Sequence, residues 1–131
     1  MAQARTIEIV IDGTTFPVEL NGTKTASELF AALPLRGDGA FWGEEIYFDV
    51  GVELPEESPR ADVEVSDVAY WLPGTALCLF FGRTPASTTD KPRAASPVTV
   101  VGRLVGDPAS LKALSNLRGS EVRGAAREPA R

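Results

Sequence analysis

Alternating hydrophobic positions predict an antiparallel hairpin at the start of the chain. Isoleucine occupies every second position over residues 7–11, and residues 16–20 repeat the alternation with Phe, Val and Leu. This period of two is typical of strands that are buried on one face. The dipeptide Asp12-Gly13 between the two segments is a tight-turn signal. We expect Pro17 to lie at an outward or edge position, because proline cannot donate a hydrogen bond to a strand ladder.

Two segments in which apolar residues recur every three or four positions predict short helices. Thr25 and Glu28 have the spacing of a capping box, and Pro34 would end the first helix. The apolar face of this helix comprises Ala26, Leu29, Phe30 and Leu33. Asp107-Pro108 predicts the start of the second helix, because aspartate caps free amides and proline fits a first turn. We expect the first helix to cover one mouth of a sheet.

Shorter strand patterns fill much of the remaining chain. Alternation returns within residues 35–50, and a further strand is expected over 98–105. Residues 63–72 and 76–81 predict two strands joined by a short turn. The second of them is apolar on both faces, which is typical of a central strand.

Three segments lack this periodicity. Residues 51–62 and 82–97 are rich in turn-forming or charged residues and predict exposed loops, the second of them mobile, and residues 119–131 predict a disordered tail. About eight short strands and two helices favour a mainly β fold, either a sandwich or a closed antiparallel barrel, and the helix after the first hairpin favours the barrel. We expect one domain over residues 1–117 and a flexible tail over 118–131.

Composition excludes several functions. The net charge of −5 and a pI near 4.7 argue against a nucleic-acid-binding protein, which needs clustered Lys and Arg. The chain has no histidine, which excludes a Ser-His-Asp triad, a Cys-His dyad and the commonest zinc sites. No apolar run approaches the roughly 20 residues that cross a bilayer, and the first residues lack the hydrophobic region of a signal peptide. We therefore expect a cytoplasmic protein that binds neither nucleic acid nor a membrane.

The sequence offers little for a metal or cofactor. Asp62, Glu64 and Asp67 lack the glycine-containing loop with fixed ligand spacing that calcium sites use. Cys78 lies within the apolar run 77–81, so we interpret it as a small core residue rather than as a thiol nucleophile. We expect neither a metal nor a cofactor.

Large aromatic residues at strand ends or beside glycines suggest a ligand groove. They are Trp42, Tyr47, Tyr70, Trp71 and Phe81. Such rings can line a groove and leave polar tips for a ligand, or they can close the core and cap the mouths of a barrel. The sequence leaves both interpretations open.

Polar candidates accompany these rings. Glu44 and Glu45 face opposite sides of a strand, and parity with Tyr47 favours Glu45 as the groove carboxylate. It could hold an amine or, with a pKa raised by burial, act as a general base; a solvated or salt-bridged glutamate is the alternative. Arg83 and Thr84 follow a glycine and either contact an anion or carbonyl group or form a plain turn. The predicted ligand-binding residues are Trp42, Glu45, Tyr47, Trp71, Phe81, Arg83 and Thr84.

Several motifs, in the same order along the chain, resemble cyclophilins. Lys-Thr-Ala at 24–26, followed by Phe30, is similar to the family's first helix motif, and the run at 98–106 is similar to its H-V-V-F-G-K-V segment. Residues 73–81 stand where cyclophilins carry an N-G-S-Q-F-F-I strand. The resemblance spans most of residues 5–115.

A closer resemblance is to a compact, cyclophilin-like group of microbial proteins of unassigned function. It is carried by W-G-E-E-I-Y-F at 42–48, D-V-A-Y-W at 67–71 and F-G-R-T-P at 81–85. The resemblance implies an eight-stranded barrel rather than an activity, because one fold hosts many functions.

The chain departs from cyclophilins where their catalysis resides. Cyclophilins use an F-H-R-V segment whose arginine donates hydrogen bonds to the twisting prolyl amide, whereas residues 41–45 here contain two acids and no arginine. The glutamine of the later strand is also missing near residues 77–79. Lowering a rotation barrier of ~18–20 kcal/mol depends on such positioned groups, so the departure implies no efficient prolyl isomerisation.

The primary hypothesis is therefore a barrel that binds a small polar molecule or an extended peptide without chemistry of its own. Two alternatives stay open. One is a divergent peptidyl-prolyl cis-trans isomerase in which Arg83 replaces the missing arginine. The other, by analogy with proteins of the same barrel, is a non-catalytic partner of an enzyme subunit, and a homo-oligomer is a further possibility.

Overall fold

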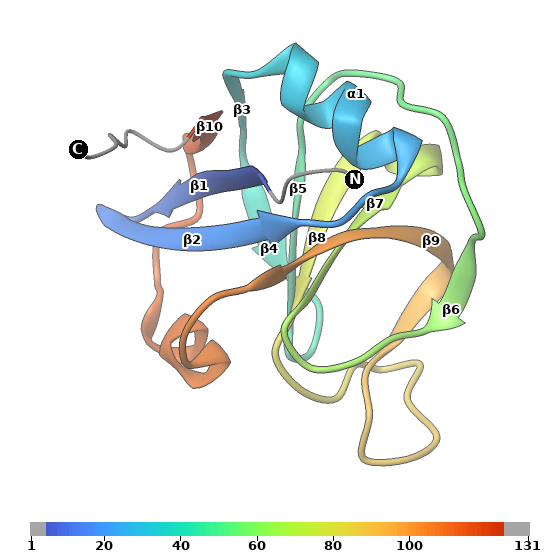
Figure 1. Ribbon diagram of the computed structural model, residues 1–131. Coiled ribbons are helices and arrows are strands. Elements are labelled where there is room, and N and C mark those ends of the chain that lie inside the picture. The colour runs from blue at the N-terminus through green and yellow to red at the C-terminus, as the bar shows by residue number, and fades with distance from the viewer. Residues whose placement is uncertain (1–4, 125–131) are drawn as a thin grey trace.

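Ten strands and one α-helix form most of the computed structural model, which describes residues 5–124 (Figure 1). The strands are β1 (Arg5–Ile11), β2 (Thr14–Leu20), β3 (Leu35–Gly37), β4 (Gly39–Phe41), β5 (Glu45–Asp49), β6 (Arg60–Asp62), β7 (Asp67–Trp71), β8 (Ala76–Phe80), β9 (Arg93–Leu104) and β10 (Ser120–Gly124). The helices are α1 (Lys24–Ala32) and the 3₁₀ helices η1 (Leu72–Gly74) and η2 (Pro108–Ala113). No helix within residues 5–124 is long and apolar enough to span a membrane.

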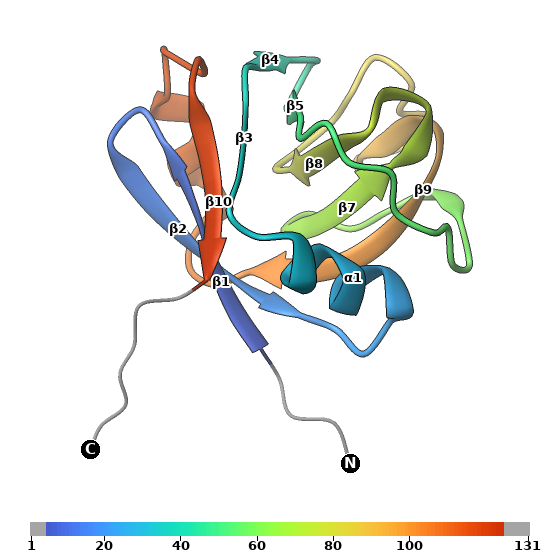
Figure 2. The same ribbon diagram turned by 90° about the horizontal axis from the view of Figure 1, so that it is seen from above.

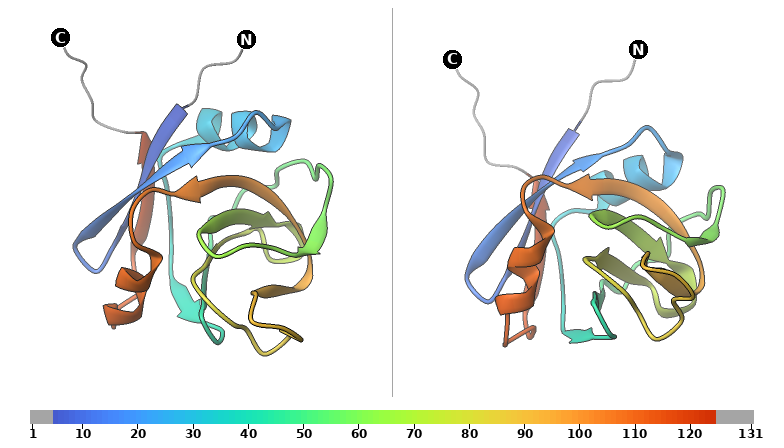
Figure 3. Two further views of the ribbon diagram at one scale, coloured as in Figure 1. Left: turned by 60° about the horizontal axis from the view of Figure 1, so that its bottom comes forward. Right: turned by 90° about the horizontal axis from the view of Figure 1, so that it is seen from below.

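Strand β9 joins the two halves of the antiparallel sheet. The strand order is β3-β10-β1-β2-β9-β7-β8-β5-β4, and β6 pairs with β9 off this path. β9 pairs with β2 along one edge and with β7 along the other, and it curves between the two halves (Figure 3). Seen from above, β1, β2 and β10 lie on one side and β5, β7 and β8 on the other (Figure 2). The sheet therefore curls around an interior.

The mainly β, antiparallel fold is confirmed, but the expected strand number and closure are not found. The sheet has ten strands rather than about eight, and in residues 5–124 no hydrogen-bonded ladder joins its end strands β3 and β4. β3, β4 and β6 have three residues each, which is too short for an alternating pattern to be recognised. The chain brings β3 close to β5 instead: a Cβ on Gly37 would lie 1.7 Å from the backbone oxygen of Asp49.

The predicted alternation accounts for the interior. The β1–β2 hairpin buries every second residue, and Pro17 is exposed as expected. β8 is buried on both faces and lies between β5 and β7, which confirms the prediction of a central strand. α1 lies over one end of the sheet (Figure 1) and adds Ala26 and Leu29 to the core. Other members of the core are Ile7, Ile9, Ile11, Ile46, Phe48, Val68, Tyr70, Leu77, Leu79 and Val101.

Both helices differ in detail from the prediction. The N-cap of α1 is Thr23, whose hydroxyl oxygen accepts a hydrogen bond from the Ala26 amide at 3.1 Å. Thr25, the predicted cap, is buried and donates its hydroxyl to the Pro55 carbonyl at 2.6 Å. The second helix is a 3₁₀ helix, and its predicted cap is confirmed because the Asp107 carboxylate accepts a hydrogen bond from the Ala109 amide at 2.9 Å.

The predicted boundary at residue 118 is wrong for part of the tail. Residues 120–124 form β10, which pairs with β1 and β3 and buries Val122 completely. Val122 is the single large apolar side chain in this strand, so the local pattern gave no strand signal. Residues 125–131 of the predicted tail lie outside the described residues.

The predicted loop over residues 82–97 is wrong at its end. Residues 93–97 belong to β9, where they pair with β6. Their Ala, Ser and Pro composition resembles a loop, and only the long-range pairing makes the segment a strand. The first half of β9 also lines a pocket, through Ala94, Ala95 and Val98.

Candidate functional site

A pocket of about 150 Å³ lies on the outer face of strands β5, β7 and β8, opposite the main interior. A second, smaller apolar cluster packs on this face, against the first half of β9. The residues that line the pocket are Trp42, Glu45, Tyr47, Trp71, Cys78, Ala94, Ala95 and Val98. The pocket is thus a shallow cavity between this face of the sheet and the first half of β9, which folds over it.

Strand register brings the pocket side chains together. Tyr47 of β5 is paired with Cys78 of β8, and Cys78 is in turn paired with Ala69 of β7. Trp71 lies two residues beyond Ala69 and Glu45 two residues before Tyr47, so all of these side chains project from the same face of the sheet. The parity argument for Glu45 and Tyr47 is therefore confirmed as to their shared face.

The turn between β4 and β5 places Trp42 beside Glu45. The Trp42 amide donates to the Glu45 carbonyl at 2.8 Å, and the Glu45 amide donates back to the Trp42 carbonyl at 3.2 Å. Such a mutual pair puts both side chains on one face of the hairpin. The turn requires glycine at position 43, because its φ is +61° and a Cβ there would lie 2.8 Å from Cδ of Pro85.

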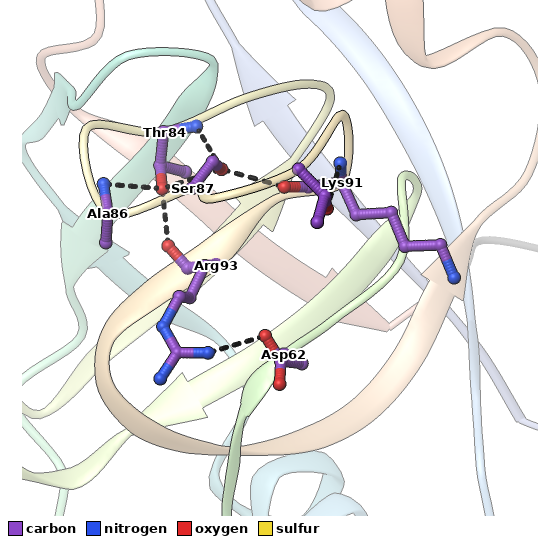
Figure 4. A network of polar contacts seen from close by, with 7 residues as sticks. Asp62, Thr84, Ala86, Ser87, Lys91 and Arg93 are labelled. Atoms are coloured by element: carbon purple, nitrogen blue, oxygen red, sulfur yellow. Dashed lines mark hydrogen bonds and ion pairs between the residues drawn. The ribbon is translucent and has the colours of Figure 1, made fainter.

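The opposite wall is held by the loop that precedes β9 (Figure 4). The Thr84 hydroxyl donates to the backbone carbonyl of Arg93, and the Thr84 amide donates to Oγ of Ser87 at 3.0 Å. The Ser87 hydroxyl in turn donates to the Lys91 carbonyl at 2.7 Å. These bonds fix the start of β9, so residues 94–95 stand as a wall facing the aromatic rings.

Two side-chain contacts tie this wall to its neighbours. Nε1 of Trp71 donates to Oγ of Ser96 at 2.6 Å, which fixes the indole ring against β9. The Arg93 guanidinium contacts the Asp62 carboxylate at 2.7 Å and links β9 to β6 (Figure 4). The pocket is therefore largely preformed, because both of its walls are fastened by contacts that need no ligand.

Glu45 is the chemically distinctive residue of the pocket. The residue is only 5% exposed, and within residues 5–124 no Lys or Arg forms an ion pair with it. Burial raises the pKa of Glu45 to about 7, and a hydrogen bond with the Cys78 side chain partly opposes this rise. Near neutral pH the pocket therefore contains both the acid and the carboxylate form.

Cys78 supports this carboxylate rather than acting as a nucleophile. Burial raises the pKa of the thiol well above its usual value, and the neighbouring Glu45 raises it further. The thiol is therefore protonated at neutral pH and lacks the thiolate that nucleophilic attack requires. Its interpretation as a buried core residue is confirmed, but it also lines the pocket, which the sequence did not indicate.

Four of the seven predicted ligand-binding residues line this pocket. They are Trp42, Glu45, Tyr47 and Trp71. Phe81, Arg83 and Thr84 are absent from the lining formed by the described residues. Their ligand-binding role stays a prediction, and each of them has contacts that serve the fold.

The structural roles of these three residues are clear. Phe81 is buried in the main core and meets Phe41 edge-on at a centroid distance of 6.3 Å. Arg83 has an exposed side chain, and its carbonyl accepts a hydrogen bond from the Glu44 amide at 2.7 Å. Thr84 is buried and fixes the loop before β9, as described above.

The other two acidic or aromatic candidates also lie outside the pocket lining. Glu44 points away from Glu45 and forms an ion pair with Lys112 at 3.4 Å. Tyr70 is fully buried in the main core. Its hydroxyl donates to the Val52 carbonyl at 2.7 Å and accepts from the Leu54 amide at 3.1 Å. For Tyr70, the interpretation as a core residue is the correct one.

Sequence reasoning missed four lining residues, namely Cys78, Ala94, Ala95 and Val98. Small apolar side chains carry no chemical signal, and three of the four lie on β9, the strand whose beginning resembled a loop.

The acidic residues Asp62, Glu64 and Asp67 do not converge on a site. Asp62 pairs with Arg93, and Glu64 pairs with Lys91. Among the described residues, no group of three or more His, Cys, Asp or Glu is arranged to hold a metal ion.

Comparison with known proteins points to one family. The sequence profile of a family described as Cyclophilin-like matches residues 5–123. A solved solution structure of the hypothetical protein AF2241 from Archaeoglobus fulgidus is 38% identical, with a TM-score of 0.74, and the match covers 93% of this chain and 95% of that one. A search of curated proteins found no match.

Proposed function

This chain belongs to the Cyclophilin-like family, and from its pocket we propose that it is a binding domain for a small polar molecule or an extended peptide, without chemistry of its own. The observation that supports the proposal is the buried carboxylate of Glu45 among three aromatic side chains. A buried ionisable group without an ionic partner costs folding free energy. Such a group is therefore more readily explained by a ligand than by stability.

The size of the pocket limits what enters it. Its volume of about 150 Å³ is well below the roughly 300–1,000 Å³ of pockets that enclose drug-sized ligands. We infer that it takes one headgroup or one side chain, while the rest of the ligand lies outside. Tyr47 at the rim is 36% exposed and offers a surface for that remainder.

The two tryptophans provide a direct test of the proposed binding. The chain has two tryptophans, and both line the pocket, so tryptophan fluorescence and the two indole N–H signals in NMR spectra report on this site. A screen with small polar fragments should give saturable shifts of both indole signals. Trp71→Ala or Glu45→Ala should weaken binding of any hit about tenfold or more, whereas Glu44→Ala, on the opposite face, should not. Hits that bind both pocket variants like the wild type would remove this site.

The alternative of a divergent prolyl isomerase lacks a suitable donor. The described lining contains no Arg or Lys. The contact of Arg83, the candidate replacement, with the neighbouring turn is made by its backbone carbonyl, which accepts a hydrogen bond from the Glu44 amide. Stabilising a twisted prolyl amide needs a positioned donor of this kind. We expect a coupled proline-peptide assay on purified protein to give the uncatalysed rate. A rate that rises in proportion to protein concentration and is lost in Arg83→Ala would establish the alternative instead.

A further inference from the structure

We infer that the pocket recognises a methylated ammonium group, with Glu45 as its counter-ion and the rings of Trp42, Tyr47 and Trp71 as its walls. This inference rests on the proposed binding function and names the chemical class of ligand. The same group can be presented by a free small molecule or by a methylated lysine side chain of a peptide. The proposal concerns the headgroup that the two share.

The walls of the pocket suit a cation that carries apolar substituents. Aromatic faces attract organic cations through their quadrupoles, and quaternary ammonium ions are recognised by cages of such rings. The remaining lining side chains are apolar or weakly polar: Cys78, Ala94, Ala95 and Val98. Methyl groups can pack against these side chains, whereas a primary ammonium would leave donors without acceptors in the same space. Since Nε1 of Trp71 is engaged by Ser96, that indole has no free donor to offer an anion.

The charge of the pocket favours a cation over an anion. Glu45 is the sole carboxylate in the described lining, and the lining has no positive side chain. The other titratable groups that face Glu45 there are the thiol of Cys78 on β8 and the phenol of Tyr47 on β5, and neither carries a positive charge in any state. A bound cation would supply the missing ionic partner of the carboxylate of Glu45, a buried residue.

Binding of a cation should be linked to proton release. Burial raises the pKa of Glu45 to about 7, so at pH 6 most of the free protein carries the protonated acid. A permanent cation beside the carboxyl group favours its ionised form and therefore displaces the proton. Calorimetry at pH 6 in buffers with different ionisation enthalpies should show release of up to about one proton for each cation bound.

A matched pair of probes tests the inference on the wild-type protein. The first probe is choline, and the second is its uncharged carbon analogue, in which a tert-butyl group replaces the trimethylammonium group. Choline should shift both indole signals saturably and bind at least about tenfold more tightly than the analogue. Glu45→Gln should abolish most of this preference, and Glu44→Gln should leave it unchanged. Equal binding of the two probes, or full preference in Glu45→Gln, would overturn the inference.

A second pair of probes separates the two sources of the headgroup. A short peptide with one trimethyl-lysine is compared with the same peptide carrying unmodified lysine. Tighter binding of the methylated peptide than of choline assigns the site to peptides, and the reverse order assigns it to a small molecule. If neither cation shifts the indole signals while neutral fragments do, the ammonium inference fails and the proposed binding function stands. If no probe and no fragment shifts them, both fail.

Discussion

Glu45→Gln is expected to stabilise the folded protein above pH 7 by up to about 3 kcal/mol. The pKa of Glu45 is about 7 in the folded state against a reference value of 4.5, and each unit of difference corresponds to about 1.4 kcal/mol. Between these two values the unfolded chain has released a proton that the folded protein still holds. Stability therefore falls as pH rises from about 4.5 to 7 and is level above that range. Glutamine has the same shape and carries no charge, so it removes this loss.

Urea unfolding of wild type and Glu45→Gln at intervals between pH 4.5 and 8 measures the effect. The difference in unfolding free energy between the two proteins should grow in favour of the variant over this range, and other titrating groups cancel in the difference. Glu44→Gln is the control, because its side chain lies on the opposite face and is 42% exposed. A difference between wild type and Glu45→Gln that stays constant with pH would show that Glu45 is not buried in a dry site.

The same comparison connects stability with function. A buried acid that serves ligand binding lowers the stability of the folded protein. Removal of such a group commonly raises folding stability at the expense of activity. A saturating cationic ligand should stabilise the wild type above pH 7 and have little effect on Glu45→Gln. The stability gain and the binding loss should therefore appear in the same variant.

The sequence predicted those parts of the site that depend on local alternation. Glu45 and Tyr47 belong to one strand, so their common face follows from a period of two. Trp42 lies on the same face because a two-residue turn connects it to Glu45, and Gly43 in the sequence indicates that turn. The pairing of Tyr47 with Cys78, by contrast, is a matter of register between two strands that are far apart in the chain. A single sequence contains no information on that register.

The position of Phe81 outside the pocket lining has a related cause. β8 is buried on both faces, so alternation cannot say which of its side chains face the interior and which face the pocket. Phe81 follows this strand and packs into the main core against Phe41. The wall formed by residues 94–95 was missed for another reason: small residues next to prolines resemble a loop, and pairing with β6 makes them part of a strand.

Gly37→Ala is expected to destabilise the protein by about 3 kcal/mol or more, or to prevent folding. A Cβ at this position would lie 1.7 Å from the backbone oxygen and 2.8 Å from the backbone carbon of Asp49. Backbone atoms cannot move aside as a flexible side chain can, so β3 must separate from β5. Overpacking in a well-packed region typically costs about 1–3 kcal/mol, and a clash with backbone belongs at or above the upper end of this range.

The matched control for this prediction is Gly22→Ala. No atom lies within 4 Å of a Cβ at Gly22, and its φ lies outside the left-handed range, so the substitution should change stability by less than about 1 kcal/mol. Thermal and urea unfolding of both variants measure the contrast. Because β5 carries Glu45 and Tyr47, opening of the contact between β3 and β5 should also weaken binding in the pocket. A Gly37→Ala protein as stable as Gly22→Ala would show that β3 and β5 do not meet at this contact, and that the curled sheet is held by its hydrogen-bonded ladders alone.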